Sequence, residues 1–227
     1  MAPIEFYYWP TPNGWKVSIA LHALDLPYDL RLVDIGADAQ FDTDFLKVSP
    51  NNKIPAITDP EGPDGAPISI FESGAILQYL ARKTGRFCGE TERERIAVDE
   101  WLMWQMGGLG PMAGQAHHFL KFAREDVPYA KDRYRAEVAR LYGVLDRKLD
   151  ETRFVAGDGF TIADMAIWPW ASLWRGQQQS LDDKPALARW LEEVADRPDV
   201  RAGRELRADL RRDPTAAADW RATLTTG

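Results

Sequence analysis

The segment IEFYYWPTPNGWKVSIALHALDLPYDLRLV, residues 4–33, decides how the chain begins to fold. Its start, residues 4–9, is rich in aromatic side chains, which favour a strand. A loop with prolines and a glycine follows, and apolar residues then recur at helical spacing over 16–24. Residues 30–33 have the character of a second strand. A strand, a helix and a second strand in this order predict a β-α-β unit.

The region after this unit contains two more short strands and a helix. Residues 54–58 and 68–71 are strand-like, and the turn-rich segment 59–65 between them predicts a hairpin. Residues 73–82 place apolar side chains on one helical face. The order β-α-β, a connecting segment and then β-β-α predicts a small α/β domain of the thioredoxin-like kind.

Beyond residue 90 the strand signals disappear and helical patterns follow. Glycines and a proline at 107–111 interrupt the helical stretch 92–124, which predicts a kink or a join between two helices. Thr161 and Asp164 resemble a capping box at the start of a helix. Further helices are predicted over residues 131–151, 165–173 and 185–195.

These patterns divide the chain into three parts. We predict a thioredoxin-like domain over residues 1–84, a linker over 85–91 and an all-helical domain over 92–227. The end of the chain, from Asp213 to Gly227, is small and polar in composition, and we expect it to be loosely held.

The composition limits the classes of function. The 227 residues carry 28 basic and 35 acidic side chains, a net charge of −7, which argues against a general nucleic-acid binder. No apolar run is long enough for a membrane-spanning helix, and residues 1–5 lack the features of a secretory signal. The single cysteine, Cys88, excludes an internal disulfide and a zinc site of several thiolates. We therefore expect a soluble, cytoplasmic protein whose partners include neither nucleic acid nor membrane.

Several short motifs, in this order, resemble those of the cytosolic glutathione transferases. They are TPNG at 11–14, SPNNKIPAI at 49–57, FESGAI at 71–76, WQMGGLGPM at 104–112 and ADMA at 163–166. The resemblance covers essentially the whole chain. It is similar in particular to the bacterial nu class, which resembles disulfide-bond oxidoreductases that use glutathione as the thiol. It implies a thioredoxin-like domain followed by an all-α domain, and a homodimer with residues 92–112 as a candidate shared surface.

Glutathione carries two carboxylates, an amine and a thiol, so its site needs helix starts that hold anions. Glu72 and Ser73 open a helix whose unpaired amides can hold a carboxylate, and Glu72 can take the ammonium. The alternative is an ordinary helix N-cap. The resemblance implies a cis Ile54–Pro55 peptide bond that turns the Ile54 backbone toward the ligand. Further polar contacts implied by the resemblance come from Gln40, Asn51 and Lys53, although a solvated surface charge explains Lys53 equally well.

The resemblance places the activation of the glutathione thiol at Thr11 and Asn13, after the first strand. A threonine hydroxyl and an asparagine amide can both donate a hydrogen bond to sulfur. A helix start also lowers the pKa of a thiol below its free value of about 8.5. The alternatives are a turn residue for Thr11 and a helix N-cap for Asn13. Tyr7 and Tyr8 lie inside the strand, where we expect them to pack.

The motif at 11–14 has no cysteine, so any disulfide chemistry must use bound thiols. One glutathione thiolate attacks a disulfide and a second resolves the mixed species. The resemblance implies that Arg133 holds a carboxylate of the second molecule, for which the forked guanidinium is suited. The alternative for Arg133 is an ion pair with Glu137 one helical turn away.

The leading hypothesis is an enzyme that reduces disulfides with glutathione, using Thr11 and Asn13. Conjugation of glutathione to small electrophiles is the second hypothesis, and a non-catalytic binding protein on the same fold is the third. The expected ligand is glutathione or its disulfide, one or two molecules per subunit, with no metal. His117 and His118 are helical neighbours that point about 100° apart, which argues against a metal pair.

Overall fold

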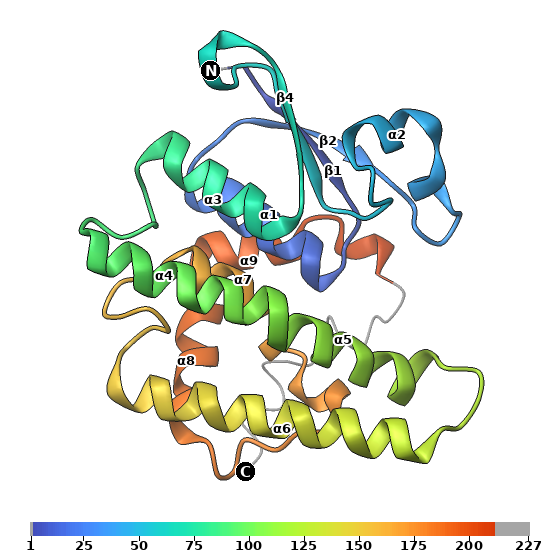
Figure 1. Cartoon of the computed structure of the whole chain (residues 1–227), viewed down its shortest axis with the longest axis vertical. Coiled ribbons are helices and arrows are strands. Elements are labelled where there is room, and N and C mark those ends of the chain that lie inside the picture. The colour runs from blue at the N-terminus through green and yellow to red at the C-terminus, as the bar shows by residue number, and fades with distance from the viewer. Residues whose placement is uncertain (1, 212–227) are drawn as a thin grey trace. The chain divides into compact units, whose positions relative to one another are not determined.

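The computed structural model describes residues 2–211 and divides the chain into two compact units. Within the described residues, one unit consists of residues 2–86 together with residues 198–211, and the other is Phe87–Arg197 (Figure 1). The predicted loose segment from Asp213 to Gly227 lies outside the described residues.

The first unit is built on a sheet of the order β2-β1-β3-β4. The strands are β1 Ile4–Tyr8, β2 Tyr28–Leu32, β3 Ala56–Asp59 and β4 Ile68–Phe71. β1 and β2 are parallel, whereas β1 with β3 and β3 with β4 are antiparallel. The predicted β-α-β unit and hairpin are therefore confirmed.

Helices pack on both faces of this sheet. They are α1 Pro12–Ala23, α2 Thr43–Val48 and α3 Ser73–Thr84, together with the short 3-10 helices Ala39–Phe41 and Pro63–Gly65. Ile4, Phe6 and Tyr8 of β1 are buried on one face, because side chains alternate along a strand. Tyr7 faces the opposite side, where its ring lies 5.8 Å from that of Phe45 in α2.

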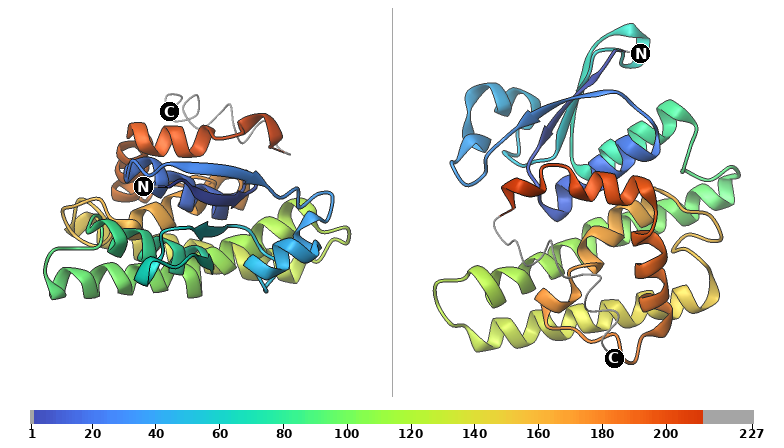
Figure 2. Two further views of the ribbon diagram at one scale, coloured as in Figure 1. Left: turned by 90° about the horizontal axis from the view of Figure 1, so that it is seen from above. Right: turned by 180° about the vertical axis from the view of Figure 1, so that it is seen from behind.

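A helix from the end of the described chain completes the first unit. Helix α9, Pro198–Glu205, packs along α1 (Figure 2), and the 3-10 helix Ala208–Leu210 follows it. The Ser18 hydroxyl donates to the Gly203 carbonyl at 2.6 Å. A Cβ on Gly203 would lie 2.5 Å from the Ile19 backbone nitrogen, so only glycine permits this approach. The prediction that the helical domain continues through residues 198–211 is therefore wrong, because it followed the local helical pattern and not this packing.

The second unit is helical. Its helices are α4 Glu92–Trp104, α5 Gly110–His117, α6 Pro128–Glu151, α7 Ile162–Ala171 and α8 Pro185–Ala195, with a 3-10 helix at Trp174–Gln177. The predicted interruption at 107–111 overlaps a π-helical turn, Gln105–Leu109, and a second π-helical turn covers His118–Phe122. The capping box of Thr161 and Asp164 is confirmed. In residues 2–211, no helix has both the length and the apolar character needed to cross a membrane.

Candidate functional site

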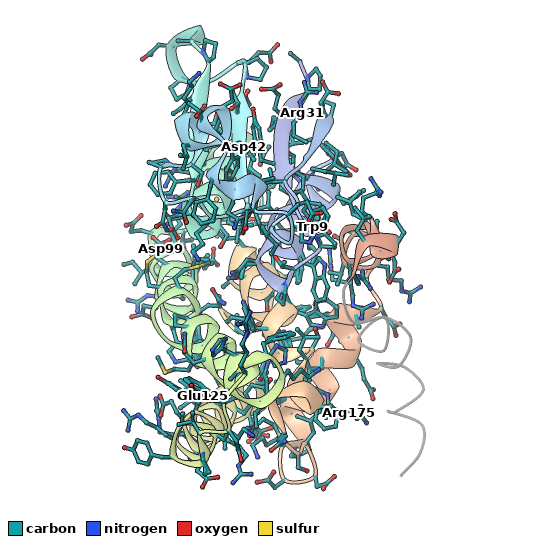
Figure 3. All side chains as sticks on the ribbon, turned by 90° about the vertical axis from the view of Figure 1, so that its right-hand side faces the viewer. Trp9, Arg31, Asp42, Asp99, Glu125 and Arg175 are labelled. Atoms are coloured by element: carbon teal, nitrogen blue, oxygen red, sulfur yellow. The ribbon has the colours of Figure 1, made fainter. Side chains whose placement is uncertain are left out.

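The loop between β1 and α1 is ordered by hydrogen bonds to Thr11. This loop starts at Trp9, which is labelled in Figure 3. Thr11 has an extended backbone and is the N-cap of α1, and its Oγ1 accepts a hydrogen bond from the Gly14 amide at 3.2 Å. Because Oγ1 accepts in this bond, the hydroxyl hydrogen can still be donated to a ligand. The N-cap of α1 is therefore Thr11 and not Asn13, which lies half-buried in the first turn, so the N-cap alternative for Asn13 is wrong.

Gly14 allows α1 to begin very close to the end of β1. A Cβ at this position would lie 2.4 Å from the Trp9 carbonyl oxygen and 2.8 Å from the Tyr8 ring. The helix start and the strand end are therefore held together as one rigid corner.

The Tyr8 side chain is buried at this corner, and its hydroxyl donates to the Leu206 carbonyl at 2.9 Å. Burial raises the pKa of Tyr8 above its usual range, so the phenol is neutral. The expectation that Tyr8 packs in the structure is confirmed.

A hydrogen bond from Ser49 stabilises the loop before β3. The buried Ser49 hydroxyl donates to the Lys53 carbonyl at 2.8 Å. The Ile54–Pro55 peptide bond that follows is cis, as the resemblance implies. The side chains of Asn51 and Lys53 are exposed on this loop, so both can reach a ligand from solvent.

Gln40 has an unused acceptor. It lies half-buried in the 3-10 helix Ala39–Phe41, where its amide nitrogen donates to Asp38 at 3.4 Å. Its Oε1 is buried and accepts no hydrogen bond from any residue that the structure describes. A buried acceptor without a donor is costly, which is the pattern expected where a ligand supplies the donor.

The start of α3 differs from an ordinary helix cap. Glu72 precedes the helix with φ of 68° and ψ of 113°, in the region that favours glycine. Within residues 2–211 its side chain makes no capping hydrogen bond and is exposed. Ser73 is buried directly after it. An ordinary N-cap has an extended backbone and a capping side chain, so the alternative reading of Glu72 is wrong.

Lys16, for which the sequence predicts no role, lies on α1 and is only 2% exposed. Burial lowers the pKa of Lys16 to about 7, and the Glu72 carboxylate opposes this shift. A buried cation is costly and calls for a specific reason. The sequence contains a signal for this buried lysine, because Lys16 is the one charged residue within residues 14–21. The other residues of that run are apolar or small, and all eight are buried.

The hollow of about 430 Å³ in the first unit is a separate feature. It lies on the α2 face of the sheet and is lined in part by Tyr7, Arg31, Asp42 and Phe45. Arg31 and Asp42 are labelled in Figure 3. Among the described residues, none of the predicted glutathione contacts lines it. The candidate site is therefore defined by the helix starts and the loop before β3, and not by this hollow.

Arg133 belongs to the second unit, where it lies exposed on α6. The Glu137 carboxylate accepts two hydrogen bonds from Arg140, at 2.8 and 2.7 Å. The hydrogen-bonded partner of Glu137 is therefore Arg140, while the positive charge of Arg133 makes a smaller contribution that also lowers the pKa of Glu137.

The histidines and the cysteine lie outside the candidate site. The His117 ring lies 5.9 Å from that of Trp170, and His118 is exposed. Cys88 is half-buried and reduced. Over residues 2–211, no group of three or more metal-binding side chains comes together.

Comparisons with known proteins agree with this architecture. The glutathione S-transferase N-terminal domain family matches residues 11–83, and the C-terminal domain family matches residues 109–198. Disulfide-bond oxidoreductase YfcG of Escherichia coli is 49% identical over 196 residues, which cover 86% of this chain and 91% of YfcG. Disulfide-bond oxidoreductase YghU of the same organism is 40% identical over 215 residues, covering 89% of this chain and 74% of YghU.

Solved structures extend the similarity to proteins with bound ligands. A glutathione transferase from Burkholderia graminis, with two glutathione molecules bound per subunit, has a TM-score of 0.86 and 43% identity. The alignment covers 89% of this chain and 88% of that one. A glutathione transferase from Pseudomonas putida, with one glutathione disulfide per subunit, has a TM-score of 0.86 and 41% identity over 90% of this chain and 92% of that one. The arrangement of the helix starts, the cis-proline loop and these similarities together show that the chain belongs to the glutathione transferase family.

Proposed function

We propose that this enzyme reduces disulfides with glutathione as the thiol donor. The observation that carries the proposal is the first turn of α1, where Thr11 and Asn13 present a hydroxyl and an amide, and where the motif contains no cysteine. Such a turn can stabilise a bound thiolate but cannot form its own disulfide. The names of the Escherichia coli relatives, both disulfide-bond oxidoreductases, support this choice.

Glutathione binds, in this proposal, across the edge of the first unit. The exposed Glu72 carboxylate takes the ligand's ammonium, and the start of α3 at Ser73 holds the neighbouring carboxylate. The Ile54 backbone pairs with the cysteinyl amide, and Gln40 offers its buried Oε1 to a ligand N–H. Asn51 and Lys53 hold the glycyl end of the ligand. Glu72, Asn51 and Lys53 are exposed, and Oε1 of Gln40 accepts no hydrogen bond from the described residues, which supports their role as ligand contacts.

The reaction consists of two thiol–disulfide exchanges. The glutathione thiol loses its proton, and the resulting thiolate attacks one sulfur of the disulfide substrate. A new sulfur–sulfur bond forms as the old one breaks, and the other half of the substrate leaves as a thiolate that takes up a proton. A second glutathione thiolate attacks the glutathione sulfur of the mixed disulfide and releases the remaining thiol. Two electrons pass from two glutathiones to the substrate, and glutathione disulfide is the product.

Arg133 is our proposed contact for the second glutathione. Its guanidinium is exposed and can bind a carboxylate through two parallel hydrogen bonds. Binding of one or two glutathiones per subunit is consistent with the relatives from Burkholderia graminis and Pseudomonas putida.

Conjugation of glutathione to small electrophiles is the second candidate function. The family domains and the glutathione transferase names of the structural relatives favour it. The same activated thiolate would attack carbon instead of sulfur, so the two candidates differ only in the electrophile.

We also infer a cytoplasmic homodimer of the nu class. The motifs support the class, and the single cysteine suits a reducing compartment. Ile96 and Met103, exposed on α4, support residues 92–112 as the shared surface. Analytical ultracentrifugation at increasing protein concentration tests the dimer, and a single species at the monomer mass of 25.7 kDa would exclude it.

Glutathione-dependent reduction of a small synthetic disulfide by Cys88→Ala protein tests the proposed activity. Turnover equal to that of the wild type is expected, because the chemistry resides on bound glutathione. Loss of turnover in the folded variant would place the reaction on Cys88. Absence of turnover in both proteins, with conjugation intact, would favour the second candidate.

A further inference from the structure

The end of the described chain lies against the turn that starts α1. Trp15 belongs to this turn, since its amide donates to the Thr11 carbonyl at 2.9 Å. The segment after α9 is held beside it by the bond from the Tyr8 hydroxyl to the Leu206 carbonyl. These contacts join residues far apart in the chain within the same unit. The segment is therefore a structural neighbour of the proposed thiolate site.

Two guanidinium groups, that of Arg204 in α9 and that of Arg211 after it, lie over one indole. The central carbon of the Arg204 guanidinium lies 5.5 Å from the Trp15 ring centroid, and that of Arg211 lies 5.1 Å from it. Arg211 also donates a hydrogen bond to the Arg204 carbonyl. Distances under about 6 Å from an aromatic face are those of cation–π interactions. Two cations thus contact the side chain of Trp15, a residue of the first turn of α1.

These cations are poorly screened by solvent. Arg204 is 3% exposed, and Trp15 is buried with its indole N–H donating to no residue that the structure describes. Glu205 pairs with Arg204 at 3.0 Å, but 58% of the Glu205 side chain is exposed. Burial lowers the pKa of Arg204 to about 10, so the group is still charged at neutral pH. Among the described residues the cluster therefore contains two cations and one carboxylate, and Arg204 is shielded from solvent.

Other ionisable side chains also lie near the first turns of α1. Lys16 follows Trp15 directly and is influenced by Glu72 at the start of α3. Tyr8 is neutral because burial raises its pKa. Glu205 thus acts on Arg204 and Arg211, whereas Glu72 acts on Lys16, and both carboxylates belong to exposed residues.

We propose that Arg204 and Arg211 are positioning residues of the glutathione site, which add positive charge at the start of α1 and favour the bound thiolate over the thiol. This inference rests on the proposed function, because it assumes that the glutathione sulfur binds at Thr11 and Asn13. The arginines do not touch the sulfur. They act by making the electrostatic potential at the start of α1 more positive, and the Trp15 ring holds them in place for this.

The experiment measures the pKa of the bound thiol. Glutathione is titrated on the protein, and the ultraviolet absorbance of the thiolate is followed as a function of pH. In the wild type we expect the midpoint to lie below that of free glutathione. Arg204→Met keeps a long side chain against Trp15 and removes the charge. It should raise the midpoint by about half a unit, because removal of a nearby positive charge disfavours the thiolate.

Two matched variants serve as controls. Arg207→Met removes a charge from the same segment, but Arg207 pairs with Asp209 at 2.8 Å on the surface, so the midpoint should not move. Arg204→Lys should restore a midpoint close to that of the wild type. Affinity for S-methylglutathione, which has no ionisable thiol, should be equal in all three variants and the wild type, and reports whether the site is still folded.

The outcomes separate this inference from the proposed function. A raised midpoint in Arg204→Met alone, with unchanged S-methylglutathione affinity, supports the role of the arginines. Equal midpoints in Arg204→Met and the wild type, both below free glutathione, overturn it and leave the proposed function standing. A wild-type midpoint equal to that of free glutathione overturns both. Loss of S-methylglutathione affinity in Arg204→Met, with the affinity kept in Arg204→Lys, also counts against a purely electrostatic role.

Discussion

Replacement of Asp164 should be among the most destabilising single changes in the helical unit. The Asp164 carboxylate is fully buried at the start of α7. One oxygen accepts the Val155 amide at 3.1 Å and the Trp190 indole N–H at 3.0 Å. The other accepts the Thr161 amide at 2.9 Å and the Thr161 hydroxyl at 3.1 Å. One side chain therefore joins α7, α8 and the loop that precedes α7.

The expected loss follows from counting the donors left without a partner. Asp164→Ala leaves the amides of Val155 and Thr161 and the Trp190 indole N–H buried, at about 1–3 kcal/mol each, so we expect a loss of ~5 kcal/mol. Asp164→Asn keeps the shape, and its NH₂ can donate to the Thr161 hydroxyl oxygen. The Thr161 amide then loses its acceptor and the Thr161 hydroxyl hydrogen has to turn away from it, and we expect a loss of ~2 kcal/mol.

Urea unfolding followed by tryptophan fluorescence measures both losses, with the shift in midpoint converted through the slope of the transition. Asp158→Asn is the control, because Asp158 is exposed in the same loop and should change stability by less than about 0.5 kcal/mol. Equal losses for the two Asp164 variants, or a loss below about 1 kcal/mol for Asp164→Ala, would refute the hydrogen-bond argument.

Three further predictions concern the site and the sheet. Thr11→Ala should lower glutathione-dependent turnover by about tenfold or more, because a donor to the thiolate is lost, whereas Tyr7→Phe should leave turnover unchanged. Steady-state rates compare the two variants, and a larger loss in Tyr7→Phe would contradict the assignment of Thr11. Arg133→Ala should weaken a second glutathione by about tenfold and spare the first, and calorimetry that finds both equally weakened would exclude this role. Burial alone would raise the pKa of Asp59, but hydrogen bonds from Lys83 and its other partners outweigh burial and hold the pKa below its usual value. The stability that Asp59 contributes is therefore present above the unfolded pKa of about 3.9 and is lost at lower pH, so the advantage of the wild type over Asp59→Asn in urea should shrink between about pH 6 and about pH 3.

Much of the candidate site could be predicted from the sequence, because its residues belong to short motifs with local structure. The proline- and glycine-containing loop after the first strand placed Thr11 and Asn13 at a helix start. The motif FESGAI likewise placed Glu72 and Ser73 at the start of the next helix. The sequence could not show the left-handed backbone of Glu72 or the unused acceptor of Gln40, because these depend on how neighbouring segments meet.

The sequence by itself determined the order of strands and helices, the change from an α/β to a helical region and the cap formed by Thr161 and Asp164. Each of these depends on residues within a few positions of one another, where periodicity, turn residues and capping pairs are direct physical signals. Tertiary structure alone decided that α9 leaves the helical unit and packs along α1, and that Lys16 and Arg204 become buried cations. A helical pattern shows which face of a segment is apolar but not which distant surface will cover it. That choice was made by packing, where the missing side chain of Gly203 allows α9 to approach the backbone of α1.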